Sequence, residues 1–324
     1  MIVLTRTDTT ALADLGACIQ AVRAAFHGYG TGRALGVARV HLDGLAGGVF
    51  HLTAGGIETD DGGTVGLKLN GRFPGEGGGQ RMAGAILLSD ATTGEPVALL
   101  DSMIVTRLRT AAVTAVAVEQ LARPDASTAL IVGAGRQARG QVDALLTTRR
   151  IKRLATFDLV PAQAEALAEY ARSQGLDAGA TDDVLTAAAG SDVVVTITPA
   201  REPILGADDV APGALVVALG ADGPGKQELD PALLARARVV VDILEQAAAS
   251  GELQHALASG LLRAEDVHAE LGQVVAGTRP GRTSADEIFV FDGTGTALQD
   301  IAAAQLLVDE ARKRGAGVEI ALDR

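Results

Sequence analysis

The feature that most constrains the fold is a series of short, continuous apolar runs between residues 128 and 291. The runs are TALIVG, RLATFD, DVVVTIT, ALVVALG, RVVVDI and EIFVF, and they alternate with segments of helical character. A strand that is apolar along its whole length has both faces buried, which is typical of a parallel sheet covered by helices on both sides. This region is therefore predicted to be a doubly wound α/β fold.

The N-terminal third has a different pattern. Apolar residues recur at helical spacing from Leu12 to Phe26, which predicts an amphipathic helix that ends near Gly28. Residues 34–100 contain short β-type runs separated by glycine, with a glycine-rich turn at 75–79, so an antiparallel sheet is expected. A long apolar helix is predicted over 106–121.

A helix predicted over 297–314 follows the last strand of the parallel sheet. Because that sheet is already complete, we expect this helix to pack on the N-terminal part of the chain. The sequence thus predicts two domains. One is a discontinuous α+β domain of residues 1–122 and 296–324, and the other is a Rossmann domain of residues 123–295.

Composition excludes several classes of function. The 28 basic and 40 acidic residues give a net charge of −12, whereas a nucleic-acid-binding protein needs a basic face. Arginines can still form a local positive pocket for a small anion. Cys18 is the single cysteine and the five histidines lack metal-ligand spacing, so no metal is expected. With no signal-peptide pattern and no apolar stretch of about 18 residues, a cytoplasmic protein without a membrane span is expected.

The segment TALIVGAGRQARGQ carries the strongest local signal. A buried strand leads into Gly133-Ala134-Gly135-Arg136-Gln137-Ala138, the GxGxxA form of the dinucleotide-binding fingerprint, and then into a helix. Gly133 permits the tight turn, Gly135 lets a pyrophosphate approach backbone N–H groups, and the small Ala138 lets helix and strand pack closely. Arg136 and Gln137 complete the predicted cofactor-binding turn.

Asp158 closes the next strand, 25 residues after Gly133, and its spacing suits recognition of a ribose. An acid at this position favours NAD(H) over NADP(H), while Arg136 keeps NADP(H) as an alternative. The other interpretation of Asp158 is a strand-end residue that caps the next helix. Two further strands end at Thr198 and Gly220, which are expected at the same crevice because carboxyl ends of parallel strands meet at one edge.

Over nearly its full length the chain resembles the ornithine cyclodeaminase/μ-crystallin family. The resemblance is carried by several segments in order: GLKLN, TRLRTAAVTAVA, IVGAGRQA, VVVTITPAREPIL, ALGADGPGKQELD and IFVFDGTGTALQD. It implies a homodimer formed through the non-Rossmann domain, which would also bind substrate. It also implies nicotinamide-dependent chemistry at the α-carbon of a small amino or imino acid.

By this resemblance, Arg39 and Lys68 contact the substrate, and Arg109 serves the substrate carboxylate and a cofactor phosphate. Asp222 is implied as the catalytic acid/base. The remaining implied positions face the cofactor or the substrate: Ala221, Lys226, Gly293 and Thr294. Independently of the resemblance, a guanidinium suits a carboxylate, and a desolvated lysine beside an arginine has a lowered pKa that suits proton donation, so Lys68 is a second catalytic candidate.

Each of these residues has a structural alternative. Lys68 and Arg39 fit solvated strand positions, and Asp222 fits a turn before Gly223-Pro224. Arg109 lies in an apolar helix, so either a ligand or an ion-pair partner must satisfy its charge. His51 is interpreted as a strand histidine rather than a catalytic group.

Departures from the family pattern bear on the reaction. Thr53-Ala54 replaces a Met-Pro pair, His51 stands where cyclodeaminases carry a glutamate, and Gly293 stands where they carry a serine. We therefore favour an NAD(P)H-dependent ketimine reductase or amino-acid dehydrogenase. The alternative is an ornithine cyclodeaminase. A third hypothesis, a non-enzymatic nucleotide-binding protein of the crystallin type, conflicts with Asp222.

Overall fold

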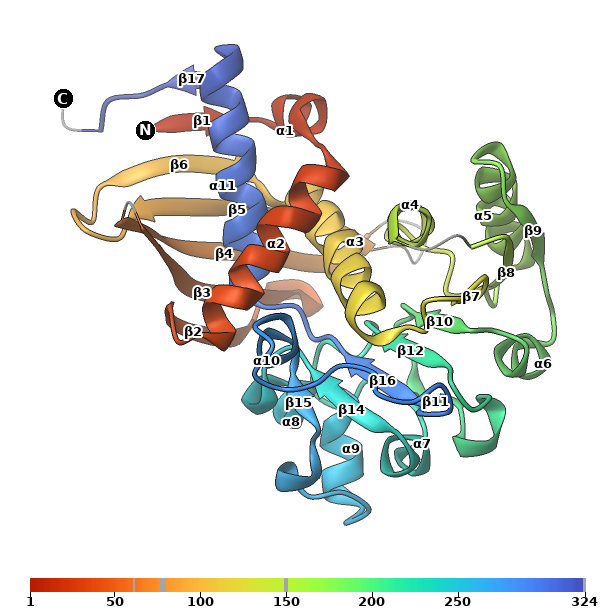
Figure 1. Ribbon diagram of the computed structural model, residues 1–324. Helices are drawn as coiled ribbons and strands as arrows, with labels where there is room; N and C mark the ends of the chain where they lie inside the picture. Colours follow the sequence, from red (N-terminus) through yellow and green to blue (C-terminus); the bar gives the residue numbers. More distant parts are fainter. Residues whose placement is uncertain (61, 76–79, 149–150, 323–324) are drawn as a thin grey trace. The chain divides into compact units, whose positions relative to one another are not determined.

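A parallel sheet forms the core of the second half of the chain (Figure 1). The computed structural model describes residues 1–60, 62–75, 80–148 and 151–322. Within these residues the sheet has the order β15-β14-β16-β12-β10-β7-β8-β9, and every neighbouring pair is parallel. The strands are β7 (Thr128–Val132), β8 (Arg153–Phe157), β9 (Asp177–Ala180), β10 (Val193–Thr196), β12 (Leu215–Ala218), β14 (Arg238–Val241), β15 (Ala269–Glu270) and β16 (Phe289–Asp292). The predicted doubly wound α/β fold is confirmed.

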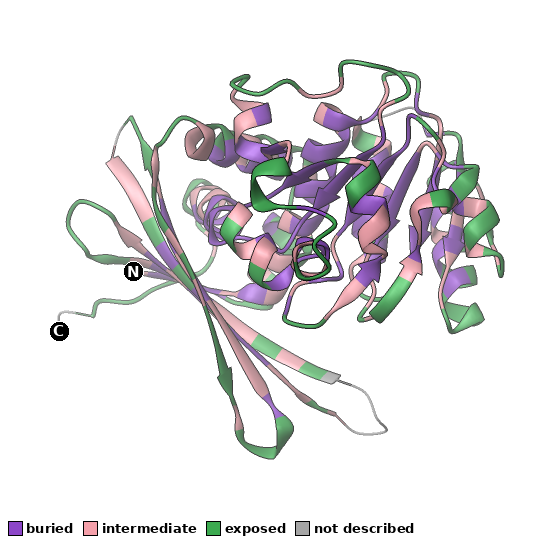
Figure 2. Ribbon diagram, turned by 90° about the horizontal axis from the view of Figure 1, so that it is seen from below, coloured by how far each residue is buried: buried purple, intermediate pink, exposed green. Residues whose placement is uncertain are grey.

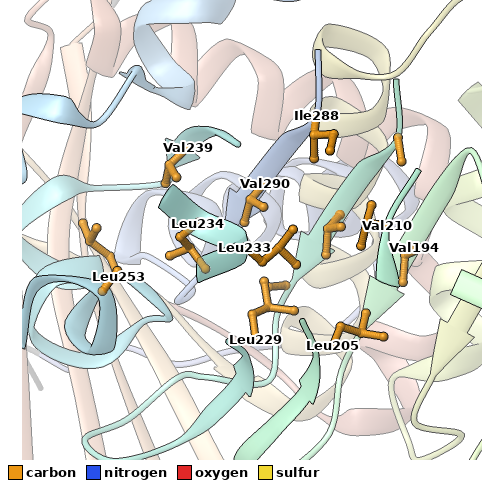
Figure 3. Packing of buried hydrophobic residues seen from close by; sticks show 14 of the residues in the cluster. Val194, Leu205, Val210, Leu229, Leu233, Leu234, Val239, Leu253, Ile288 and Val290 are labelled. Atoms are coloured by element: carbon orange, nitrogen blue, oxygen red, sulfur yellow. The ribbon is translucent and has the colours of Figure 1, made fainter. Parts of the chain in front are cut away.

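Apolar side chains on both faces explain why this sheet forms. Figure 3 shows one face, where Val194, Val290 and Leu233 belong to a single buried cluster. Ile131 and Phe291 point to the opposite face and are also fully buried. The connecting helices are α4 (Ala138–Thr148), α5 (Pro161–Ser173), α6 (Val184–Ala189), α7 (Pro231–Arg236), α8 (Leu244–Ser250), α9 (Leu253–Ala258) and α10 (Leu271–Val275). A small parallel pair joins β11 (Arg201–Leu205) and β13 (Gln227–Leu229).

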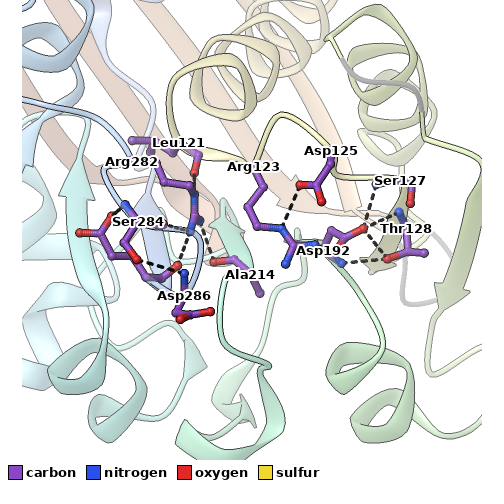
Figure 4. Close-up of polar contacts among 11 residues, drawn as sticks. Leu121, Arg123, Asp125, Ser127, Thr128, Asp192, Ala214, Arg282, Ser284 and Asp286 are labelled. Carbon is purple, nitrogen blue, oxygen red and sulfur yellow. Dashed lines mark hydrogen bonds and ion pairs between the residues drawn. The ribbon is translucent and has the colours of Figure 1, made fainter.

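Polar contacts fix the amino-terminal edge of the parallel sheet (Figure 4). Asp192 accepts hydrogen bonds from the backbone N–H groups of Ser127 and Thr128, at 2.8 and 3.0 Å, and pairs with Arg123 at 2.5 Å. Arg282 Nε donates to the Leu121 carbonyl at 2.8 Å. These contacts tie the end of the preceding helix to the beginning of β7.

Strands from the N-terminal third of the chain, together with one C-terminal strand, form a mixed sheet of order β17-β1-β6-β5-β4-β3-β2 among the described residues. Strands β2 to β6 are antiparallel, as predicted, while β1 pairs parallel with β6. The strands are β1 (Ile2–Leu4), β2 (Ala34–Asp43), β3 (Val49–Thr59), β4 (Gly62–Pro74), β5 (Gln80–Asp90), β6 (Pro96–Asp101) and β17 (Val318–Glu319). Most of the turn predicted at 75–79 lies outside the described residues.

Helices α2 (Leu15–Gly30) and α11 (Ala297–Arg314) pack together, and α11 lies on the mixed sheet (Figure 1). Glycine permits the close approach, since a Cβ on Gly66 would lie 2.7 Å from Ile301. The opposite face of the sheet carries exposed apolar side chains, and the strands alternate between buried and exposed residues (Figure 2). The exposed apolar residues of β2 and β4 on this face include Val40, Leu42, Val65, Leu67 and Leu69.

The described chain divides into two compact units. The mixed-sheet unit comprises residues 1–112 and 296–324, and the parallel-sheet unit comprises residues 113–295. Helix α3 (Ser102–Leu121) contributes residues to both, and it begins four residues before the predicted start at Thr106.

The predicted N-terminal helix is α2, and a separate helix that was not predicted, α1 (Arg6–Leu12), precedes it. Ala13 is extended, with φ −65° and ψ 124°, and ends the first helix. The Asp14 side chain then accepts a hydrogen bond from the Ala17 backbone N–H at 3.0 Å and caps the second. The helical spacing of the apolar residues continues across this break and so does not reveal it.

Candidate functional site

The fingerprint turn has the geometry that a dinucleotide requires. Gly133 has φ +101°, and a Cβ there would lie 2.8 Å from the Ile197 carbonyl oxygen, so only glycine fits without strain. A Cβ on Gly135 would meet no atom within 4 Å, which leaves open space beside this backbone. Buried Ala138 begins α4 directly after the turn. The turn and helix N-terminus thus fit a pyrophosphate.

Asp158 holds the same turn from the next strand. Its Oδ2 accepts a hydrogen bond from the Ala134 backbone N–H and its Oδ1 accepts one from Val160, both at 2.8 Å. The alternative in which Asp158 caps the next helix is wrong, because α5 has no side-chain cap hydrogen bond. Asp158 instead holds the fingerprint turn, and its ribose role stays a prediction. Arg136 is exposed and Gln137 is half-buried beside it.

A buried carboxylate that the sequence analysis gave no role joins two strand ends. Glu228 accepts hydrogen bonds from Thr196 Oγ1 at 2.7 Å, from the Thr198 backbone N–H at 2.6 Å and from the Gly220 backbone N–H at 2.8 Å. Thr198 Oγ1 adds a fourth at 2.8 Å. Burial raises the pKa of Glu228, while these donors oppose the shift. Thr198 and Gly220, both predicted at the cofactor crevice, are thereby held together.

Asp222 lies in the loop after β12, next to buried Ala221. Its Oδ1 is 2.5 Å from Lys226 Nζ, which also donates to the Gly220 carbonyl at 3.1 Å. The Asp222 side chain is 50% exposed, against 12% for Lys226. The carboxylate is therefore both accessible and charge-paired, which suits a group that exchanges protons with a ligand.

The turn after β16 is anchored by another buried acid. Asp242 accepts hydrogen bonds from Thr294 Oγ1 at 3.0 Å and from the Gly295 backbone N–H at 2.8 Å. Gly293 donates to the Ala218 carbonyl at 2.9 Å, and a Cβ on it would lie 2.7 Å from Leu219. The Thr294 hydroxyl is thus engaged within the unit, while Gly293 is required for close packing.

Two more carboxyl groups lie at this edge. Glu252 accepts the backbone N–H groups of Glu228 and Leu229 at 2.8 and 3.0 Å, and Asp292 accepts that of Leu253 at 2.9 Å. Burial, with the nearby Asp292 and Glu228 charges adding to it, raises the pKa of Glu252 to about 9. Burial likewise raises the pKa of Asp292 to about 7.

In the mixed-sheet unit, Lys68 and Arg109 share one carboxylate. Lys68 Nζ lies 2.5 Å from Asp300 Oδ2, and Arg109 Nε lies 3.1 Å from Asp300 Oδ1. Thr53 Oγ1 donates to the same acid at 3.2 Å, and Arg109 Nη1 donates to Gln299 Oε1 at 3.1 Å. Burial lowers the pKa of Lys68 to about 8, with Arg109 and Arg39 contributing in the same direction. The solvated-strand alternative for Lys68 is wrong, since its side chain is only 7% exposed.

Arg39 belongs to this group by register. It pairs with Thr53 across β2 and β3, and Thr53 pairs with Lys68 across β3 and β4, so all three side chains share one sheet face. The structure therefore brings Arg39, Lys68 and Arg109 together within the mixed-sheet unit. Lys68 and Arg109 pair with Asp300, and Arg39 lies on the same face, so the arrangement can bind a carboxylate.

Among the described residues, no group of three or more histidine, cysteine, aspartate or glutamate side chains could hold a metal ion. Of the helices in the described ranges, none has the length and apolar character needed to cross a membrane.

Two relatives of known name align with most of the chain. Alanine dehydrogenase of Archaeoglobus fulgidus is 35% identical over 321 residues, covering 98% of each chain. Iminosuccinate reductase of Paracoccus denitrificans is 40% identical over 259 residues, covering 79% of this chain and 80% of the relative.

Solved structures share the whole architecture. An archaeal alanine dehydrogenase dimer with bound NAD superposes with a TM-score of 0.93 at 34% identity, covering 99% of each chain. Thermococcus litoralis Δ1-pyrroline-2-carboxylate reductase with NADH and L-proline gives 0.92 at 29% identity, covering 99% of this chain and 100% of that one. A lysine cyclodeaminase that recognises L-lysine, L-ornithine and L-2,4-diaminobutyric acid gives 0.86 at 29% identity, covering 100% and 96%.

The family model drawn from such proteins matches residues 1–315, which include both the fingerprint turn and the cation cluster. The resemblance predicted from the sequence motifs is confirmed. The chain belongs to the ornithine cyclodeaminase/mu-crystallin family.

Proposed function

We propose that the protein is an NAD(H)-dependent oxidoreductase that reduces a small 2-imino acid or oxidises the corresponding amino acid. The observation that carries this proposal is the buried Lys68–Asp300–Arg109 group, in which two cations share one carboxylate. A surplus of buried positive charge is costly unless an anion joins it, and an amino or imino acid brings its α-carboxylate. The reductase and dehydrogenase relatives support this reaction class.

Arg39, Lys68 and Arg109 would bind the substrate carboxylate. Arg109 offers a planar guanidinium for two parallel hydrogen bonds, while Lys68 offers a point charge whose pKa of about 8 keeps it protonated at neutral pH. Because that pKa is near neutrality, Lys68 can also donate a proton to the substrate. The role proposed for Arg109 at a cofactor phosphate rests on the family resemblance.

Asp222 is proposed as the acid/base. Conversion of an imine to an amine needs a proton at nitrogen as well as a hydride at the α-carbon, and the nicotinamide supplies the hydride. The half-exposed Asp222 side chain can deliver that proton from its carboxylic acid form, and the Lys226 ammonium at 2.5 Å then pairs with the carboxylate that remains.

The proposed cofactor contacts lie on five segments of the parallel-sheet unit. The open space at Gly135 supports a pyrophosphate there, and Asp158 supports NAD(H) rather than NADP(H) because an acid repels a 2′-phosphate. The proposed set is Gly133, Gly135, Arg136, Gln137, Ala138, Asp158, Thr198, Gly220, Ala221, Lys226 and Gly293. We retain Thr294 as a substrate-facing residue, although its hydroxyl bonds Asp242.

A cyclodeaminase is the second candidate, favoured by the lysine cyclodeaminase neighbour. Its substrate carries a second amine, which would be cationic at neutral pH. Positive side chains predominate around Lys68, and His51 supplies no negative charge, so this group of residues suits that substrate less well.

We also propose a cytoplasmic homodimer. The apolar outer face of the mixed sheet, with Leu67 39% and Leu69 41% exposed, supports a second copy of the chain as its cover. A Leu67→Glu variant should run as a monomer in light scattering, whereas the wild type should run as a dimer. An unchanged mass for the variant would contradict this interface.

The reaction is tested by NADH consumption with pyruvate plus ammonia, Δ1-pyrroline-2-carboxylate, and oxaloacetate plus ammonia. Asp222→Asn should lose at least about 100-fold in kcat, in the range expected for general acid catalysis. Asp177→Asn, an exposed acid of the same unit, serves as the control. No NADH consumption, together with ammonia release from ornithine in the presence of NAD, would establish the cyclodeaminase instead.

A further inference from the structure

Helix α11 begins without the side-chain cap that its sequence would allow. Thr296 is the N-cap residue and Gln299 follows three positions later, which is the spacing of a capping box. Thr296 nevertheless makes no side-chain cap hydrogen bond, although it is 0% exposed. The first N–H groups of a helix have no acceptor within the helix, so the buried start of α11 is rich in donors.

Gln299 gives its oxygen to a neighbouring cation instead of to the cap. Its Oε1 accepts a hydrogen bond from Arg109 Nη1 at 3.1 Å, and a guanidinium can only donate. This contact fixes the orientation of the amide, because the reversed amide would place two donors against each other. Nε2 is therefore the other arm of the amide. It has no hydrogen-bond partner among the described residues, although Gln299 is fully buried.

Two buried donors without a partner thus occur together at the start of α11. Thr296 Oγ1 is the second, within the part of the chain that the structure describes. Further along the same helix a glutamine is satisfied at both ends, since Gln305 accepts from Thr64 Oγ1 at 3.1 Å and donates to Asp309 at 2.8 Å. A buried polar group without a partner is costly, so this pair of donors indicates a ligand that accepts hydrogen bonds.

The charges around Gln299 favour an anion as that ligand. Arg109 and Lys68 share the carboxylate of Asp300, at 3.1 and 2.5 Å, which leaves one positive charge in excess among these three groups. The positive end of the α11 dipole adds to it. The oxygen and nitrogen of an amide are roughly 2.2 Å apart, so Nε2 lies within roughly 5 Å of Arg109 Nη1. A carboxylate can bridge donors at this separation, with one oxygen on each.

We propose that Gln299 is a substrate-binding residue, whose amide nitrogen donates to the α-carboxylate while its oxygen holds Arg109 in place for the same carboxylate. The Thr296 hydroxyl and the first N–H groups of α11 complete this anion site. The inference rests on the proposed oxidoreductase function and adds residues that recognise the substrate. The carboxylate is unchanged by the reaction, so Gln299 acts on substrate binding and not on hydride or proton transfer.

The test compares KM and kcat of the wild type, Gln299→Glu and Gln299→Met at saturating NADH and ammonia, with pyruvate as the varied substrate. Glutamate keeps an acceptor for Arg109 but lacks the donor, and methionine lacks both. Each variant should raise KM by about 10- to 100-fold, as expected for loss of a hydrogen bond to a charged group, and change kcat by less than about threefold. Gln305→Met, on the same helix, is the matched control and should leave KM unchanged.

Two kinetic results would overturn the inference in variants that circular dichroism shows to be folded. A wild-type KM in Gln299→Glu would mean that the residue only holds Arg109, because glutamate still can. A lower kcat with an unchanged KM in either variant would mean that Gln299 does not act on substrate binding.

Direct binding separates this inference from the function on which it rests. In titration calorimetry with NADH present and ammonia absent, the wild type should bind pyruvate at least about tenfold more tightly than pyruvamide, its uncharged amide, and Gln299→Met should lose most of that preference. Equal binding of the two compounds, or a preference that Gln299→Met retains, would overturn the anion site. The expected preference without NADH consumption for any imine would support the anion site and refute only the proposed function.

Discussion

Asp300→Asn is the substitution that most directly probes the buried charge cluster. Asp300 is 2% exposed and is the carboxylate partner of both Lys68 and Arg109, at 2.5 and 3.1 Å. Asparagine keeps the shape but removes the negative charge that Lys68 and Arg109 share. Removal of one partner from a buried ion pair costs about 3–5 kcal/mol of unfolding free energy, and we expect a loss in that range at pH 7.

The pH dependence of this loss is set by Lys68. In the wild type the Asp300 charge holds the pKa of Lys68 up at about 8 against the effect of burial. In the variant the loss of that charge lowers the pKa of Lys68, so at pH 7 the folded variant binds less of this proton than the folded wild type. At pH 7 this difference stabilises the wild type by up to about 1.4 kcal/mol, and the advantage disappears as pH rises through 8. The difference in unfolding free energy between variant and wild type should therefore narrow by up to about 1.4 kcal/mol between pH 7 and pH 9.

Urea unfolding at a fixed protein concentration, at pH 7 and pH 9, measures both quantities. Asp309→Asn, on the same helix but half-buried and away from Lys68, is the matched control and should lose less than about 1 kcal/mol at both pH values. A deficit for Asp300→Asn that is below 1 kcal/mol, or that is the same at both pH values, would refute the reasoning.

Three further changes address the parallel-sheet unit. Gly133→Ala places a Cβ 2.8 Å from the Ile197 carbonyl at φ +101°, so we expect a loss of about 1–3 kcal/mol and at least tenfold weaker NADH binding by fluorescence titration; unchanged affinity would contradict the turn assignment. Glu228→Gln leaves buried donors unpaired and should cost about 2–5 kcal/mol in urea unfolding, whereas a neutral effect would mean that the strand ends do not need this acid. Asp158→Ser should raise kcat/KM with NADPH relative to NADH by at least tenfold, and an unchanged ratio would leave Asp158 only its role in holding the turn.

Sequence patterns predicted the strands that carry continuous apolar runs. The six apolar runs are all strands of the parallel sheet, and most of them are buried on both faces, which leaves an unbroken signature. Strand β8 is the least buried of the six, with Arg153 exposed. The edge strand β9 has the sequence DAGA, and three of its four residues are exposed, so it has no such signature. Strand β11 of the small pair β11–β13 also lacks a continuous buried apolar run, because Arg201 to Pro203 are exposed.

The break between α1 and α2 did carry a sequence signal. Thr5 and Asp8 form a capping box at the start of α1, and Asp14 caps α2, so two N-terminal signals stand within ten residues of each other. The apolar period alone runs through both helices, because Leu12 and Leu15 keep helical spacing across the break. The N-cap residues Thr5 and Asp14 therefore predict two helices where the apolar spacing alone predicts one.

The candidate site was predictable where a motif fixes a residue to a backbone geometry. The strand–turn–helix geometry requires a glycine at Gly133 and a small residue at Ala138, so both positions follow from the motif. Asp300 was not predictable in this way, since its partners Lys68 and Arg109 lie 232 and 191 residues earlier in the chain. From the sequence alone, Arg109 was expected to have either a ligand or an ion-pair partner. The packing of α11 on the mixed sheet brings Asp300 to Arg109 as that partner.

The two units stabilise buried charge in opposite ways, and this explains how an acidic protein can accommodate anionic ligands. Asp292 and Glu252 are bonded by backbone N–H groups, and their pKa values of about 7 and about 9 leave one or both protonated near neutral pH. The carboxyl edge of the parallel sheet is therefore less negative than its acids suggest. In the mixed-sheet unit the excess charge is positive, around Lys68 and Arg109. The net charge of −12 therefore does not exclude a local anion site in either unit.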